Sequence, residues 1–145
     1  MKQTIYLPCS IVLNNDIQEV KQLNVFVSDV CATVHLDDDT ATNVELAIEE
    51  AVVNVMNYAY PYEWEGKIHV KAYASGGKLF FEISDSGIPF DPTKAKEADI
   101  SLSVKQRSIG GLGIYLIRKY MDNMEYKRIE GRNVLTLSKN LNFPL

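Results

Sequence analysis

The sequence predicts an α+β fold in which helices cover one face of a mixed, mainly antiparallel sheet. In two long segments, apolar residues recur at three- and four-residue steps, which is the period of an amphipathic helix. In two other regions, apolar and polar residues alternate on either side of a glycine-containing turn, as in antiparallel hairpins. With 145 residues the chain can bury one core without disulfides. We therefore expect a two-layer α/β sandwich that forms a single domain over residues 1–145.

The composition restricts the functions that this domain can have. Fifteen basic and nineteen acidic residues give a net charge of -4, which argues against a broad nucleic-acid surface. Cys9 and Cys31 lack the spacing of a metal finger, and two thiols are typical of a reducing cytosol. No apolar run approaches the ~18 residues of a membrane span, and the N-terminus lacks a secretory signal. These features predict a cytoplasmic protein.

The N-terminal segment is predicted to form a strand and then a helix. Thr4–Leu7 is expected to be a short strand that Pro8 ends. Asn15 or Asp16 is expected to cap the helix that follows. The apolar residues that should face inward from this helix are Ile17, Val20, Leu23, Val27, Val30 and Val34.

The segment Asn43–Pro61 is predicted to be one long helix, capped by Thr40 or Asp39. Its apolar stripe consists of Val44, Ile48, Ala51, Val52, Val55 and Met56. Glu50 and Asn54 are four residues apart, so they lie one turn apart at the edge of this stripe. A base and a hard oxygen ligand in that arrangement fit a Mg-nucleotide site, and an ordinary solvated helix edge is the alternative.

The C-terminal half is predicted to contain two hairpins and a third helix. Lys67–Ala74 and Lys78–Ser84 should form the first hairpin around Gly76-Gly77. A helix should begin after the glycines at 110–113 and run toward Met124. The second hairpin should pair residues 125–129 with residues 134–138.

Two segments in this half carry chemistry. Asp85 ends a strand and precedes Gly87, so its carboxylate can accept from the amine of adenine, whereas guanine offers an oxygen there. An ordinary Asp-x-Gly turn is the alternative. Gly110, Gly111 and Gly113 open a helix whose N–H groups can bind phosphate, although a flexible hinge would have the same composition. Lys105 and Arg107 lie just upstream.

In this order the segments resemble the GHKL ATPase superfamily, whose nucleotide-binding fold is the Bergerat fold. The resemblance rests on EEAVVNVMNYAYP, SDSGIPFDP, GGLGIYLIRKYMD and NVLTLSK, and it covers nearly the whole chain. Among gyrase-type ATPases, heat-shock-protein-90 chaperones, sensor histidine kinases and anti-sigma-factor serine kinases, the sequence is most similar to the last group. Two departures from the usual motif are Val55 and Tyr58.

The resemblance implies a role for each motif residue. Asn54 would be the Mg²⁺ ligand and Glu50 the general base for a serine hydroxyl. Asp85 would hold adenine, with Gly87 allowing the base to approach. The residues that would complete the ATP site are Arg107 in a lid over residues 94–109, Gly110, Gly111 and Gly113 at the phosphates, and Thr136 at the adenine end.

Glu50 separates the subfamilies, because sensor histidine kinases usually carry Asn at that position and their imidazole needs no base. The resemblance thus implies a serine/threonine protein kinase that acts in transcription regulation as an anti-sigma factor, phosphorylating a STAS-type anti-anti-sigma protein from MgATP. We expect no nucleic-acid or membrane partner, on the grounds of net charge and of the missing apolar run. A bound sigma factor and a homodimer stay possible partners under the resemblance. Two alternatives remain: a non-catalytic, nucleotide-gated protein-binding module and a GHKL ATP hydrolase.

Overall fold

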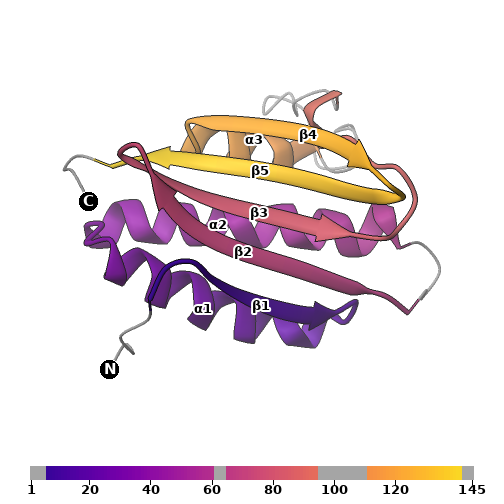
Figure 1. Ribbon diagram of the computed structural model, residues 1–145, viewed down its shortest axis with the longest axis horizontal. Coiled ribbons are helices and arrows are strands. Elements are labelled where there is room, and N and C mark those ends of the chain that lie inside the picture. Colours follow the sequence, from indigo (N-terminus) through magenta and orange to yellow (C-terminus); the bar gives the residue numbers. More distant parts are fainter. Residues whose placement is uncertain (1–5, 61–64, 95–110, 142–145) are drawn as a thin grey trace.

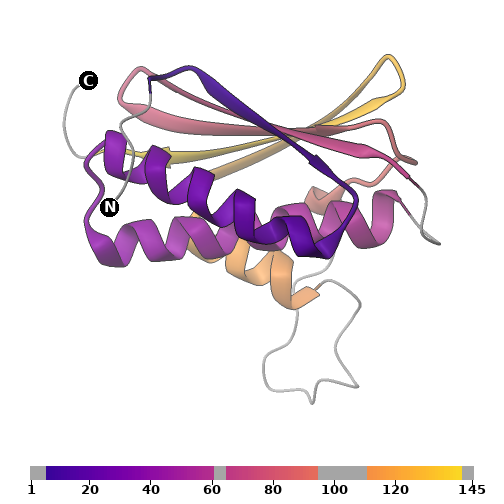
Figure 2. The same cartoon turned by 90° about the horizontal axis from the view of Figure 1, so that it is seen from below.

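The computed structural model describes residues 6–60, 65–94 and 111–141, which form two layers (Figures 1 and 2). One layer is a five-stranded sheet in the order β1-β2-β3-β5-β4. Its strands are β1 Cys9–Asn14, β2 Lys67–Ser75, β3 Lys78–Asp85, β4 Asn123–Ile129 and β5 Arg132–Asn140. The helices α1 Val20–Thr33, α2 Asp38–Asn54 and α3 Gly111–Tyr120 cover one face of this sheet. The predicted α+β sandwich is confirmed.

The strand pairings are antiparallel throughout the described part of the chain, so the predicted mixed character of the sheet is wrong. β4 runs in the same direction as β3, as expected for strands joined through a helix. However, β5 lies between them and is antiparallel to both. The sheet therefore contains strands of equal direction that are not neighbours.

The first strand lies later than predicted. β1 follows Pro8 rather than preceding it, and it pairs with β2 from Cys9 opposite Ala72 onward. Leu13 is buried on the helix side, whereas Val12 is 47% exposed on the other side. The strand thus forms over CSIVLN, where exposed side chains alternate with partly or fully buried ones, and it does not include Tyr6 or Leu7. Thr4 and Ile5 of the predicted strand lie outside the described residues.

The helix α1 is preceded by a short 3-10 turn, η1 Ile17–Glu19. The side chain of Asp16 caps this turn by accepting from the backbone N–H of Gln18 at 2.9 Å. Of the six residues predicted to face inward, five are buried, but Ile17 is 62% exposed. Ile17 lies in the 3-10 turn, where side chains do not keep the phase of the α-helix that follows.

The helix α2 begins before the predicted start and ends in an unusual turn. Asp37 rather than Asp39 or Thr40 caps it, accepting from the backbone N–H of Thr40 at 3.2 Å. All six residues of the predicted apolar stripe are buried. After Asn54 the chain continues as one π-helical turn, η2 Val55–Ala59, a distortion that is frequent at functional sites. Pro61, the predicted end, lies outside the described residues.

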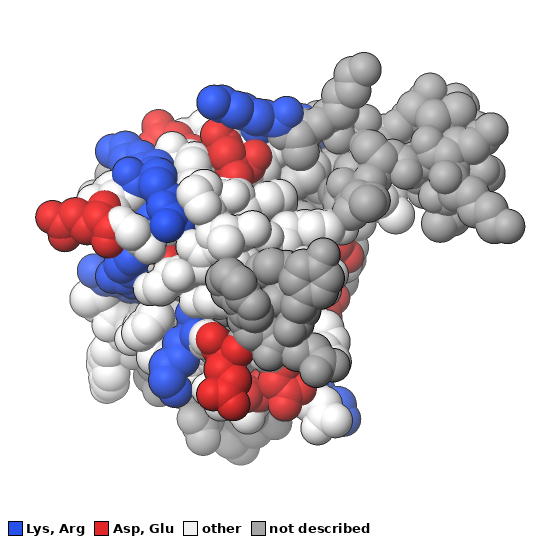
Figure 3. Space-filling view, turned by 90° about the vertical axis from the view of Figure 1, so that its right-hand side faces the viewer, with Lys and Arg blue, Asp and Glu red and all other residues white. Residues whose placement is uncertain are grey.

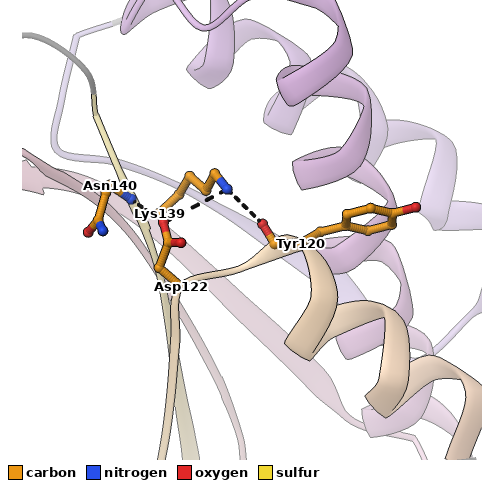
Figure 4. A network of polar contacts seen from close by, with 4 residues as sticks. All are labelled: Tyr120, Asp122, Lys139 and Asn140. Atoms are coloured by element: carbon orange, nitrogen blue, oxygen red, sulfur yellow. Dashed lines mark hydrogen bonds and ion pairs between the residues drawn. The ribbon is translucent and has the colours of Figure 1, made fainter.

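The helix α3 ends at Tyr120, before the predicted Met124, because a polar network closes its last turn (Figure 4). The Lys139 ammonium of β5 donates to the carbonyl of Tyr120 at 3.2 Å and lies 3.8 Å from the Asp122 carboxylate. Asp122 also accepts from the backbone N–H of Asn140 at 2.6 Å. A cation at the C-terminus of a helix is favourable, so Lys139 fastens α3 to the sheet.

Candidate nucleotide-binding site

A small cavity lies where the end of α2, the end of β3 and the last two strands meet. The residues that line it are Ala51, Asn54, Val55, Ile83, Asp85, Phe90, Pro92, Ile117, Tyr126, Asn133 and Leu135. Its volume is about 10 Å³, which is the room of roughly one water molecule. A larger ligand must therefore move part of the wall. Phe90 and Pro92 come from the segment after β3, which lacks sheet hydrogen bonds in the described structure.

Asp85 is the acidic residue among the described residues that line this cavity, and 1% of its surface is exposed. Its Oδ1 accepts from the backbone N–H of Gly87 and from Nδ2 of Asn133, both at 2.8 Å. Its Oδ2 is buried and has no hydrogen-bond partner among the described residues. Burial raises the pKa of the Asp85 carboxyl, and the two hydrogen bonds oppose that rise. A buried acceptor without a partner is typical of a position that a ligand completes.

Residue 87 has no room for a side chain, because it packs against the backbone of the turn η2. A Cβ at this position would lie 2.2 Å from the backbone oxygen of Ala59, in the π-helical turn η2. The same oxygen accepts from the N–H of Ile88 at 2.9 Å. The close contact holds the loop after Asp85 against the turn η2. The approach of a base to Gly87 stays a prediction.

Glu50 and Asn54 lie together where α3 packs on α2. A Cβ on Gly113 would lie 2.8 Å from Oε2 of Glu50 and 3.4 Å from Nδ2 of Asn54. A side chain at residue 113 would therefore have to displace the carboxylate of Glu50, whereas glycine leaves it in place. The predicted edge of α2 is thus covered by the glycine-containing start of α3.

The electrostatics of this pair suit a base and a ligand. Burial raises the pKa of the Glu50 carboxyl, and the neighbouring charge of Glu49 raises it further. Asn54 is 5% exposed, and its Nδ2 has no hydrogen-bond partner in the described part of the chain. No cluster of three or more His, Cys, Asp or Glu occurs among the described residues. A lone amide ligand fits Mg²⁺ that is bound mainly through phosphates and water.

The remaining predicted residues are placed less favourably. Thr136 is on β5 between Leu135 and Leu137, which face the helices, so strand alternation puts Thr136 on the opposite face, beside Glu82. The structure therefore does not bring Thr136 to the cavity. Gly111 is the first residue of α3. The residues that lie outside the described ranges are Lys105, Arg107, Gly110 and the predicted lid except Lys94.

Asn133 lines the cavity and Tyr60 contacts the backbone next to Asp85, and neither residue was predicted from the sequence. Asn133 lies opposite Asp85 in the pairing of β3 with β5. The hydroxyl of Tyr60 accepts from the N–H of Ser86 and donates to the carbonyl of Lys67, both at 2.9 Å. Tyr60 therefore joins the end of η2 to the ends of two strands. The register of β3 and β5 is the signal that could have revealed Asn133.

Among the described residues, the surface at this end of the sheet shows no dominant sign of charge. Figure 3 faces the end of the sheet at which β3 ends, and it shows Lys and Arg interspersed with Asp and Glu. The described residues on this face form no broad basic surface, in agreement with the net charge of -4. None of the helices within the described ranges is long and apolar enough to span a membrane.

The two-layer fold and the family comparison place this chain among the histidine-kinase-like ATPase domains. The chain belongs to the family described as histidine kinase-like ATPase domain, whose model matches residues 13–139. It is 30% identical over 95 residues to the serine/threonine-protein kinase BtrW of Bordetella bronchiseptica. That match covers 66% of this chain and 67% of BtrW. It is 28% identical over 120 residues to the serine-protein kinase RsbW of Listeria monocytogenes, and this match covers 80% of this chain and 76% of RsbW.

Solved structures support the fold. The RsbU and RsbW domains of a Mycobacterium tuberculosis protein match with a TM-score of 0.67 at 18% identity, over 96% of this chain. This chain covers 34% of that longer chain. The catalytic domain of the histidine kinase ThkA matches with a TM-score of 0.52 at 15% identity, over 91% of this chain and 97% of ThkA's domain. The predicted family is confirmed, and the predicted enzyme class is that of the named kinases.

Proposed function

We propose that this chain is an ATP-dependent serine/threonine protein kinase that acts as an anti-sigma factor by phosphorylating a STAS-type anti-anti-sigma protein in the cytoplasm. The observation that carries this proposal is the contact of Glu50 and Asn54 with Gly113, at the start of α3. It combines a carboxylate of raised pKa, a buried amide and the N-terminus of a helix. Those are a base, a ligand and a phosphate site for one reaction.

ATP would be held at both ends by side chains of the described structure, Asp85 at the base and Asn54 at the phosphates. Oδ2 of Asp85 would accept from the amine of adenine, in a cavity that opens to admit the base. The amide oxygen of Asn54 would hold Mg²⁺, which when bound neutralises charge on the phosphates. The N–H groups at the start of α3 would bind the phosphate oxygens.

Glu50 would then act on the hydroxyl of the substrate. Its carboxylate accepts the hydroxyl proton while the hydroxyl oxygen bonds to the γ-phosphorus and the bond from that phosphorus to the bridging oxygen of ADP breaks. A raised pKa makes Glu50 a stronger base than an exposed glutamate. The alternative that transfers phosphate to water would use the same carboxylate, so the acceptor distinguishes kinase from hydrolase.

The test is to co-purify the partners of the chain and incubate them with γ-labelled MgATP. We expect label on a serine or threonine of a STAS-type protein. Label released only as free phosphate would identify an ATP hydrolase. ATP binding that changes partner affinity without any transfer would identify a nucleotide-gated module. Size measurement of the same sample shows whether a sigma factor or a second copy of the chain is bound.

Gly113→Ala is expected to lower phosphotransfer by roughly tenfold to a hundredfold, because the new Cβ displaces Oε2 of Glu50. The displaced atom ends a flexible side chain, and alanine favours a helix over glycine by about 1 kcal/mol, so the thermal midpoint should not fall. Leu112→Ala is the matched control, since Leu112 lies in the same turn but is 43% exposed. A Gly113→Ala protein with the wild-type rate would contradict the placement of Glu50.

A further inference from the structure

Asn133 is the most highly connected polar side chain in the cavity. It is 4% exposed and lies near the start of β5. Its Nδ2 donates to Oδ1 of Asp85 and to the carbonyl of Ile88, each at 2.8 Å. Its Oδ1 accepts from the backbone N–H of Phe90 at 3.1 Å and from the hydroxyl of Tyr126. An asparagine has two donor hydrogens and two acceptor positions, so Asn133 uses all four.

These bonds make the two oxygens of Asp85 unequal. Oδ1 receives Nδ2–H of Asn133 and the N–H of Gly87, whereas Oδ2 has no partner among the described residues. A carboxylate that is held by one oxygen in this way cannot exchange its oxygens without breaking both bonds. Asn133, together with the N–H of Gly87, therefore determines which oxygen stays available to a ligand and where that oxygen lies.

The other bonds of Asn133 hold the wall of the same cavity. Ile88 and Phe90 belong to the segment that follows β3, and Phe90 lines the cavity. The ring of Phe90 also packs on Tyr58, with centroids 5.3 Å apart. Asn133 thus connects the free oxygen of Asp85 with the wall against which a flat base would have to fit. A change at Asn133 alters both features, while Glu50 and the start of α3 are built from other elements.

We propose that Asn133 is a positioning residue for base selection, which orients Asp85 so that the site prefers a purine carrying an amine at its 6-position. This inference rests on the proposed use of ATP. Asn133 would not touch the amine itself and would act through Asp85. It should therefore affect the binding of a purine nucleotide with the 6-amine much more than the binding of the same nucleotide without it.

The test compares ATP with purine riboside triphosphate, which has hydrogen in place of the 6-amine, by calorimetry with Mg²⁺. A charge-assisted hydrogen bond corresponds to roughly a tenfold or larger preference for ATP in the wild-type chain. Asn133→Ala should reduce this preference to about threefold or less, mainly by weakening ATP. A purely structural role would weaken both ligands equally and leave the ratio unchanged.

Two further variants keep the test decisive. Asn133→Thr keeps one hydroxyl donor and much of the volume, so it reports the ratio if Asn133→Ala does not fold, and an intermediate ratio is expected. Val30→Ala removes buried methyl groups from α1, away from the site, and should lower stability without changing the ratio.

The outcomes separate this inference from the proposed function. A wild-type preference that persists in the folded Asn133 variants would overturn the role of Asn133 and leave ATP binding intact. Failure of the wild-type chain to bind either nucleotide would overturn the proposed function and this inference together. A lowered ratio in Val30→Ala as well would show that general destabilisation causes the effect, and it would also overturn the proposal.

Discussion

Replacing Glu50 with glutamine is expected to lower phosphotransfer by about 10²–10⁴-fold while ATP affinity changes by less than about threefold. Glutamine keeps the shape of the side chain beside Gly113 but cannot accept the hydroxyl proton. ATP binding relies instead on Asn54, Asp85 and the start of α3, which the substitution leaves in place. The measurements are the single-turnover rate with a saturating protein substrate and calorimetry with MgATP.

The same substitution should preserve or raise stability at neutral pH, whereas a variant that folds poorly would lose stability. The pKa of Glu50 is raised in the folded chain, so the native state binds more protons than the unfolded state between the unfolded and folded pKa values. Stability therefore falls as the pH rises through that interval, and the loss persists above it. Glu50→Gln removes this loss, so at neutral pH its thermal midpoint should equal or exceed that of the wild type.

Two comparison variants assign the effect to Glu50. Glu49→Gln removes the adjacent carboxylate, which accepts from Asn24 of α1, and it should keep phosphotransfer within a few fold. Asn54→Ala should instead lose Mg-dependent ATP binding, because the amide ligand is gone. Wild-type phosphotransfer by Glu50→Gln would show that Glu50 is not the base.

The helices and hairpins could be predicted because their periods are local. Buried stripes at helical spacing locate α1 and α2, and Gly76-Gly77 marks a turn in which both glycines have positive φ. The start of α2 was misplaced because three aspartates compete for the cap and only geometry selects Asp37. β1 was misplaced because Pro8 is compatible with the end of one strand and with the start of the next.

The candidate site could be predicted only as far as single segments allow. Glu50 and Asn54 share a helix, and Asp85 ends a strand, so sequence spacing places them. The role of Gly113 as the contact for α2 depends on how two distant helices pack. The role of Asn133 depends on the register of β3 with β5, which no local pattern encodes. Thr136 shows the same limit, because one residue along a strand changes its face, and strand alternation puts Thr136 on the face away from the cavity.

Replacing Asp85 with asparagine is expected to weaken ATP binding by at least about tenfold, the effect of losing a buried, charge-assisted hydrogen bond of roughly 1.5–3 kcal/mol. The wild-type site should prefer ATP over GTP, because Oδ2 accepts from the amine of adenine and repels the oxygen of guanine. Asparagine can donate to that oxygen, so the preference should shrink or reverse. Equal wild-type affinity for ATP and GTP in calorimetry would remove Asp85 from this role.

The control for charge loss is Asp122→Asn, at the opposite end of β5 from Asn133, which should leave nucleotide preference unchanged. The pH dependence gives a second, independent measurement. Burial raises the pKa of Asp85 against the opposing effects of Asn133, Gly87, Arg128 and Arg132. ATP affinity of the wild type should therefore fall, as the pH decreases, at a higher pH than an exposed aspartate would show. Asp85→Asn has no such carboxyl to protonate, so its weaker affinity should stay level through the same interval. A parallel decline in both proteins would assign the titration to another group.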